Sequence, residues 1–134
     1  MFEVILNRLS GLFLRWRYPV STPEDVFKAL GMELRTPKDF REFIDQLDDN
    51  HHESKNFCRF MPREEAEAHF SSAVKKERFR HQSLYSYCFK HTQKDCWVEF
   101  ILDFDQHSRL RRMYLENKDL GHKRREIQLS SLLN

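Results

Sequence analysis

The sequence predicts an α+β fold in which three to four N-terminal helices precede a three-stranded antiparallel meander. Three observations support this prediction. Helix-start signals recur through the first half of the chain, alternating apolar and polar residues fill the stretch 84–115, and two short polar segments divide that stretch into three runs. Such alternation on runs joined by short polar loops is typical of antiparallel strands with one buried face.

The length and composition fit a single domain spanning residues 1–134. A chain of 134 residues is long enough to bury a core without disulfides or a structural metal. Apolar residues make up 40% of it and charged residues 33%, which indicates a globular rather than a disordered protein. Its twelve phenylalanines predict an aromatic core.

Residues 1–18 carry the first helical pattern. We expect an amphipathic helix that packs on the domain or on a partner, and a helix lying on a membrane surface is the alternative. The apolar runs of this segment are too short to span a membrane, and they lack the layout of a secretory signal. The apolar positions at helical spacing are Phe2, Ile5, Leu6, Leu9, Leu12, Phe13 and Trp16.

Thr22 and Pro23 start the next helix. The hydroxyl suits the N-cap, and proline suits the first helical position because the N–H that it lacks is unpaired there. Asp25 adds a negative charge near the positive end of the helix dipole. We expect this helix over 23–30, with Gly31 as its C-terminal stop.

Thr36 and Pro37 repeat the same signal fourteen residues later along the chain. The pattern predicts a helix over 37–47, after which the polar stretch 48–56 reads as a loop. Its apolar face consists of Phe40, Phe43, Ile44 and Leu47.

A third helix is expected to open at Pro62, since acids follow in its first turn. The basic run 75–80 suits the C-terminal end of this helix, where cations complement the dipole. Its apolar face consists of Ala66, Phe70, Ala73 and Val74.

The three runs of the meander each have two faces. In the first, Tyr85, Tyr87 and Phe89 share a face, and in the second, Val98, Phe100, Leu102 and Phe104 do. The third is weaker and sets Leu110, Arg112 and Tyr114 against Arg111, Met113 and Leu115. The charged segment 119–134 is expected either to pack against the domain or to be a frayed tail. Its leucines are compatible with a short C-terminal helix.

The cysteines point to a reducing compartment. Cys58, Cys88 and Cys96 are an odd number and include no close-spaced pair. Such a set suits free thiols better than a disulfide framework. We therefore expect a cytoplasmic protein without disulfides.

The residues that usually carry catalysis or bind metals are not arranged in any known pattern here. His51 and His52 lie near Cys58, but no pair of ligands at zinc spacing accompanies them. With three glycines in the chain, neither a nucleophile elbow nor a phosphate-binding glycine loop is present. We predict no catalytic residue, metal ligand or cofactor, and a metal-dependent or thiol enzyme is the third hypothesis.

The leading hypothesis is a protein-interaction module, such as an adaptor, a chaperone or an inhibitor of another protein. Its candidate contact residues are Arg15, Trp16, Arg17 and Tyr18, because arginine and aromatic residues are enriched at interface hot spots. An edge of the predicted sheet could also pair with a second copy or with a partner strand.

Nucleic-acid binding is the alternative hypothesis. Residues 23–47 resemble a helix-turn-helix in outline, although Phe27 stands where a small residue would let the helices cross closely. The net charge of +2 is no nucleic-acid signature by itself, because binding needs a basic patch. The residues that would form such a patch are Lys75, Lys76, Arg78, Arg80, Arg111 and Arg112.

Overall fold

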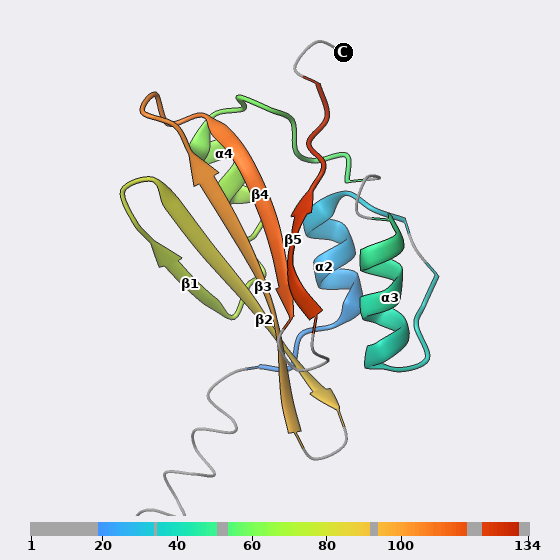
Figure 1. Ribbon diagram of the computed structural model, residues 1–134. Helices are drawn as coiled ribbons and strands as arrows, with labels where there is room; N and C mark the ends of the chain where they lie inside the picture. The colour runs from blue at the N-terminus through green and yellow to red at the C-terminus, as the bar shows by residue number, and fades with distance from the viewer. Residues whose placement is uncertain (1–18, 34, 51–53, 92–93, 118–121, 132–134) are drawn as a thin grey trace, which may run out of the picture.

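A five-stranded antiparallel sheet and three short helices make up the part of the chain that the structure describes (Figure 1). The structure is a computed structural model, and the described residues are 19–33, 35–50, 54–91, 94–117 and 122–131. The helices are α2 (Pro23–Leu30), α3 (Phe40–Asn50) and α4 (Arg63–Ala68). The strands are β1 (Lys75–Arg78), β2 (Gln82–His91), β3 (Lys94–Phe104), β4 (Leu110–Asn117) and β5 (His122–Ile127), in the order β1-β2-β3-β4-β5.

The predicted fold of three to four helices followed by a three-stranded meander is therefore wrong. The basic run expected to end a helix forms strand β1, and the segment expected to fray or form a C-terminal helix contains strand β5. Both are edge strands of the sheet. All four residues of β1 are exposed, and β5 contributes the buried Ile127 to the core, so neither segment shows the period-two pattern of a half-buried strand. The predicted helix over residues 1–18 lies outside the described residues.

Helix α2 confirms the prediction for 23–30. The Thr22 side chain accepts a hydrogen bond from the backbone N–H of Asp25, and the Asp25 carboxylate accepts one from the Thr22 N–H. Gly31 ends the helix with a φ of 73°. Because the cap residues and the terminal glycine all lie within the helix or next to it in sequence, the helix can be predicted from the sequence alone.

Helix α3 begins three residues later than predicted. Its first N–H groups are satisfied by Asp39, whose carboxylate accepts a hydrogen bond from the Glu42 N–H at 2.9 Å. Thr36 and Pro37 therefore lie in the linker before the helix. Aspartate and threonine are both good N-caps, and the sequence offers both within four positions.

Helix α4 is shorter than predicted. It ends at Ala68, and the next residues form tight turns in which the Phe70 N–H donates to the Glu67 carbonyl and the Ala73 N–H to the Phe70 carbonyl. Phe70 and Ala73 are nevertheless buried, as the apolar pattern predicts. Two serines, Ser71 and Ser72, favour a turn over continued helix.

The three central strands match the three predicted runs. β2 pairs with β3 from Gln82–Asp103 to His91–Lys94, and β3 pairs with β4. The predicted core residues of the first two runs are buried, but Ser86, Cys88 and Ile101 are buried on the opposite face as well.

A bulge changes the inward face of β4. Asp103 pairs with Arg112 and Phe104 with Leu110, which leaves Arg111 as an extra residue. The strand therefore buries Leu110, Met113 and Leu115, and the predicted grouping of Leu110 with Arg112 and Tyr114 is wrong.

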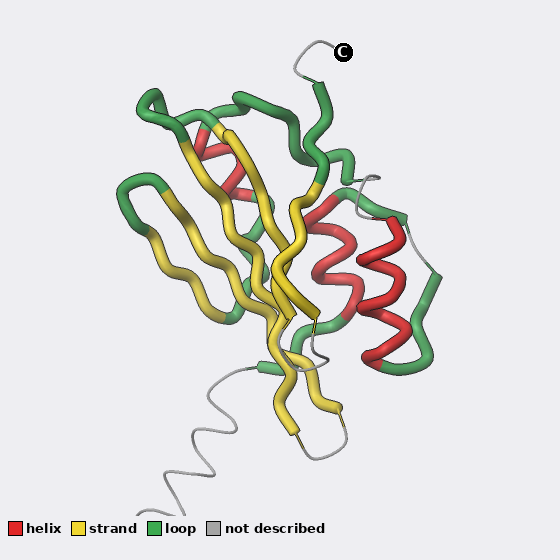
Figure 2. Tube along the Cα trace, in the orientation of Figure 1, coloured by secondary structure: helices red, strands yellow, loops and turns green. Residues whose placement is uncertain are grey.

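All three helices pack on one face of the sheet, so the fold has two layers (Figure 2). Aromatic rings connect the layers. Phe43 of α3 lies 4.8 Å from Phe89 of β2 between ring centroids, and Phe70 lies 4.8 Å from Tyr85 in a stacked arrangement. The aromatic core predicted from the phenylalanine content is thus present.

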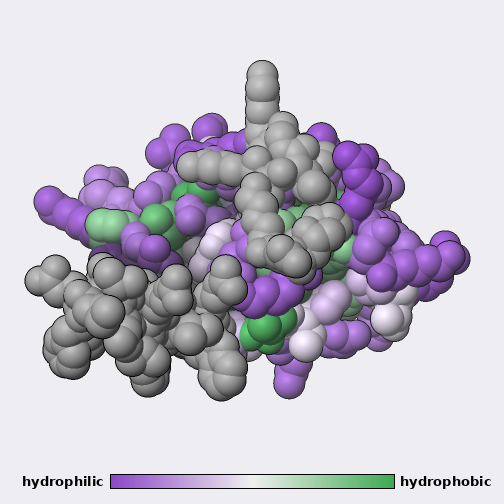
Figure 3. Space-filling model, turned by 90° about the horizontal axis from the view of Figure 1, so that it is seen from below, coloured by the Kyte–Doolittle hydropathy of each residue, from purple (hydrophilic) through white to green (hydrophobic). Residues whose placement is uncertain are grey.

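No helix among the described residues is long and apolar enough to cross a membrane. In the view from below, the described residues that are visible are mostly hydrophilic, with hydrophobic residues between the polar ones (Figure 3).

Candidate functional site

Two cavities meet at the end of the sheet formed by the β3–β4 turn. Their volumes are about 720 and 800 Å³, and Arg59, Phe60 and Arg111 line both of them. We call the two cavities together the arginine–phenylalanine groove. The first cavity is completed by His81, Phe104, Asp105, Gln106 and Arg112, and the second by Glu126 and residues 128–131.

The groove forms where β4 changes partners. At one end of the strand, the Phe60 N–H donates to the Leu110 carbonyl at 2.7 Å and the Leu110 N–H donates to the Met61 carbonyl at 2.9 Å. Further along, Met113 pairs with Ile127 of β5. The bulge residue Arg111 lies between these two partners, which is why it borders both cavities.

The segment after β5 forms the outer wall of the second cavity. Ser130 forms a parallel bridge with Cys58, and its backbone carbonyl accepts a hydrogen bond from the Arg59 N–H at 3.0 Å. The Ser130 hydroxyl also donates to the Phe57 carbonyl at 2.8 Å. These bonds fix the backbone of Arg59 and hold the wall at a defined place.

Phe60 combines an exposed ring with an unfavourable backbone conformation. Its φ is 68°, which is uncommon for a bulky residue, and the residue is 45% exposed. The hydrogen bonds of Phe60 and Met61 to Leu110 hold this conformation in place. A strained residue that presents an apolar ring to solvent is typical of functional sites.

The positive charges of the groove are only partly neutralised. Among the residues that the structure describes, no acid forms an ion pair with the guanidinium of Arg59 or of Arg111. Arg112, in contrast, interacts with other side chains of the chain: a hydrogen bond to Tyr114 raises the pKa of its guanidinium. Coulombic attraction from Tyr114, Glu126 and Asp103 acts in the same direction.

Asp105 is the acid of the first cavity, and its carboxylate is occupied within its own turn. It accepts hydrogen bonds from the backbone N–H of His107 at 2.8 Å and of Arg109 at 3.0 Å. The bond from Arg109 is the main reason why the pKa of Asp105 lies below its ordinary value. The carboxylate therefore stays ionised and shapes the turn.

A buried arginine holds the opposite wall of the first cavity. Arg63 of α4 is 7% exposed and donates hydrogen bonds to the carbonyls of Phe79 and Arg80, at 2.6 and 2.7 Å. Its guanidinium also lies 4.7 Å from the centre of the Phe104 ring. Arg63 thereby fixes the β1–β2 turn, which carries His81 into the groove.

Glu67 completes this buried cluster. Its carboxylate accepts hydrogen bonds from Ser83, from Arg63 at 3.3 Å and from Arg78 at 3.2 Å. Burial would raise the pKa of Glu67, but these hydrogen bonds and the two arginine charges outweigh burial and lower the pKa. Burial and the charge of Glu67 raise the pKa of the neighbouring Tyr85 to about 12. The sequence shows Arg63 and Glu67 as an ordinary surface pair, so this cluster was not predicted.

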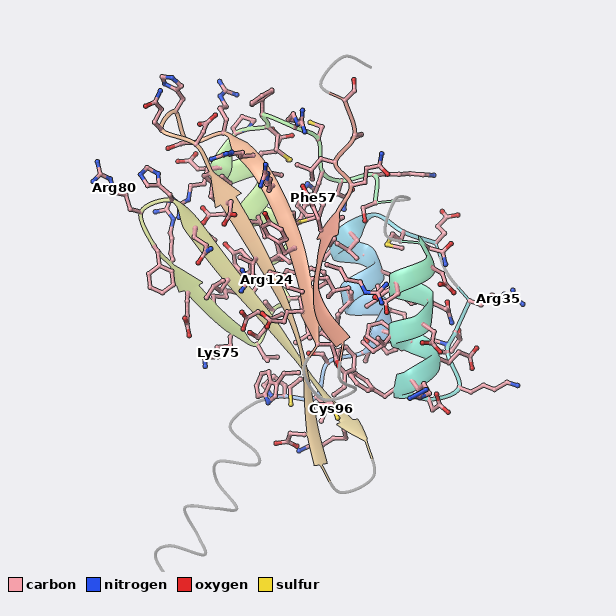
Figure 4. All side chains as sticks on the ribbon, in the orientation of Figure 1. Arg35, Phe57, Lys75, Arg80, Cys96 and Arg124 are labelled. Atoms are coloured by element: carbon pink, nitrogen blue, oxygen red, sulfur yellow. The ribbon has the colours of Figure 1, made fainter. Side chains whose placement is uncertain are left out.

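The structure separates the six basic residues of the nucleic-acid hypothesis. Lys75 and Arg80 lie at the β1 edge of the sheet (Figure 4). Lys75 pairs with Glu77 at 3.6 Å, Lys76 donates to the Ser71 carbonyl, and Arg78 pairs with Glu67. β2 and β3 lie between this edge and β4, whose Arg111 and Arg112 border the groove.

The helix-turn-helix outline at 23–47 does not match the observed arrangement. α2 and α3 lie side by side and run in the same direction (Figure 1), with a centroid distance of 5.5 Å between Phe27 and Phe43. Residues 31–39 connect them, whereas the motif needs a turn of roughly three to four residues between crossed helices.

Other predicted site residues have separate positions. Arg15, Trp16, Arg17 and Tyr18 lie outside the described residues. Of the three cysteines, Cys58 is partly exposed, and Cys88 and Cys96 are buried. Cys88 and Cys96 stand on neighbouring positions of the β2–β3 pair but on opposite faces of the sheet. Within the described ranges, no group of three potential metal ligands is present.

The sequence analysis did not single out Arg59 and Phe60, the two central residues of the groove. A signal was available, because they form an arginine–aromatic pair of the same kind as residues 15–18.

No protein-family model matches the chain, and neither the curated proteins nor the solved structures contain a significant match.

Proposed function

We propose that the protein is a non-enzymatic interaction module that binds a partner protein through the arginine–phenylalanine groove. One observation carries the proposal: the exposed Phe60 lines both cavities together with Arg59 and Arg111, whose guanidiniums have no ion pair among the described residues. Arginine and aromatic side chains dominate the energetics of protein interfaces. An odd number of cysteines without a close-spaced pair suits a cytoplasmic setting.

Residues 15–18 remain a second proposed contact surface for the same function. Trp16 is the residue to test there, because a tryptophan flanked by arginines has the composition of a hot spot. A partner that uses this segment would be lost with Trp16→Ala and retained with groove variants.

Nucleic-acid binding is the second candidate. Phe60 offers a ring on which a base can stack, and Arg59, Arg111 and Arg112 offer contacts to phosphates. It is less favoured because the basic residues of β1 interact with acids or carbonyls of the chain itself.

The test is a pull-down from the native host at moderate salt, with the full chain as bait and nuclease treatment of half of each sample. The variants are Arg59→Gln and Arg111→Gln, and the control is Arg35→Gln, an exposed arginine on the far side of the helices (Figure 4). We expect wild type and the control to retain the same protein in both halves, and the groove variants to lose it.

Three results would contradict this proposal. Recovery that disappears with nuclease would favour nucleic-acid binding. A partner lost only with Trp16→Ala would move the contact surface to residues 15–18. An empty pull-down would favour an enzyme, to be pursued through metal content and thiol reactivity.

A further inference from the structure

We infer that the groove binds an extended acidic peptide segment, whose carboxylates pair with Arg59 and Arg111 while an apolar side chain packs on Phe60. This inference rests on the proposed function and specifies the chemistry of the partner.

Charge complementarity is the first argument. A guanidinium offers a planar fork of donors that matches a carboxylate, and Arg59 and Arg111 have no such partner within the described chain. Both arginines line both cavities. A ligand that spans the two cavities therefore passes both arginines.

The apolar surface of the groove is the second argument. Phe60 is exposed, the buried Phe104 contributes to the first cavity, and the partly buried Leu129 contributes to the second. An apolar side chain between two acids could cover the Phe60 ring, which is otherwise in water.

The acids of the groove favour a peptide over a nucleic acid as its ligand. Asp105 lines the first cavity and Glu126 the second, so each cavity contains an acid as well as the two arginines. A nucleic-acid strand carries a charge at every nucleotide, so its phosphates would meet these acids. In a peptide, carboxylates can be spaced so that they face the arginines alone.

The experiment begins with a selection of random dodecapeptides displayed on phage against the wild-type full chain. We expect the enriched peptides to contain an excess of Asp and Glu around an apolar residue. Fluorescence anisotropy then measures the affinity of one enriched peptide, of its Glu→Gln counterpart and of an oligothymidylate of matched length.

Variants locate the binding. Arg59→Gln and Arg111→Gln should each weaken the acidic peptide by about tenfold or more, since each removes a charge-assisted hydrogen bond. Arg35→Gln removes the same charge on the far side of the helices and should change the affinity less than about twofold. Arg111→Glu should lose the acidic peptide and bind a counterpart with Lys in place of Glu. Near-ultraviolet circular dichroism confirms that each variant is folded.

Four results would overturn the inference. These are a selection without enrichment, enriched peptides without an acidic excess, an affinity that the groove variants leave unchanged, and oligothymidylate binding tighter than peptide binding. If the peptide result fails while Arg111→Gln still loses the natural partner in the pull-down, the proposed function stands and only the acidic chemistry of the partner is wrong.

Discussion

At the scale of single residues, the pair of the buried Arg63 and the partly buried Glu67 does more than balance two charges. Arg63 satisfies the backbone carbonyls of the β1–β2 turn, and Glu67 holds Ser83 and Arg78 next to it. A buried charge without such partners would be costly, but here each charge has several hydrogen bonds. The pair thereby positions a turn that forms one wall of the groove.

The lowered pKa of Glu67 predicts a specific pH dependence. The ordinary value is 4.5 and the folded value lies below it, so the stability that ionised Glu67 contributes is present above pH 4.5 and is lost as the pH falls through the folded pKa. Glu67→Gln should lower the free energy of unfolding at neutral pH and flatten its decline between about pH 5 and 3. Urea unfolding over a pH series measures both.

Glu64→Gln is the matched control, because Glu64 is an exposed acid on the same helix. It should leave the acid slope of the wild type almost unchanged. Equal slopes for wild type and Glu67→Gln would show that Glu67 does not carry this linkage.

At the scale of elements, strand β1 illustrates how an edge strand is protected. Its sequence is Lys75-Lys76-Glu77-Arg78, and all four residues are exposed. Charged side chains on an edge strand discourage pairing with a second molecule. This gives the basic run a structural explanation that needs no nucleic acid.

Replacing these charges should therefore promote self-association. We expect the variant Lys75→Thr, Lys76→Val, Glu77→Thr to form dimers or larger species that rise with concentration, because threonine and valine favour strands and leave the edge uncharged. Size-exclusion chromatography with light scattering measures this. Lys75→Arg with Lys76→Arg keeps the charge and should behave as wild type; if the uncharged variant stays monomeric as well, charge does not protect this edge.

The elements also show what could be predicted from the sequence. α2 was predicted correctly because its cap, its proline and its terminal glycine are local signals. β1 and β5 were missed because edge strands bury few side chains, and the inward face of β4 was misassigned because a bulge at Arg111 breaks the alternation. The groove combines Arg59 and Phe60 with side chains from three other parts of the chain, and no sequence spacing encodes that convergence.

At the scale of the whole molecule, the segment after β5 is tied to the segment before α4. The Ser130 hydroxyl donates to the Phe57 carbonyl across 73 positions of sequence. Together with the bridge between Cys58 and Ser130, this contact holds Ser130 in the wall of the second cavity.

Ser130 and Ser131 provide a matched pair to test this closure. Ser130→Ala removes the hydroxyl's bond to the Phe57 carbonyl, keeps the bond from the Ser130 N–H, and should lower the free energy of unfolding by about 1 kcal/mol. Ser131 is exposed, and Ser131→Ala should change the free energy of unfolding by less than about 0.5 kcal/mol. Urea unfolding of both variants provides the comparison, and equal effects would show that the Ser130 bond does not hold the wall.

The strand order has a consequence for the route of folding. Each strand pairs with its neighbour in sequence, so the sheet can grow hairpin by hairpin without closing long loops. The groove instead requires contacts separated by 49 and 73 residues, whose closure costs more chain entropy. A refolding chain would thus form its central hairpin early and the contacts around the groove late.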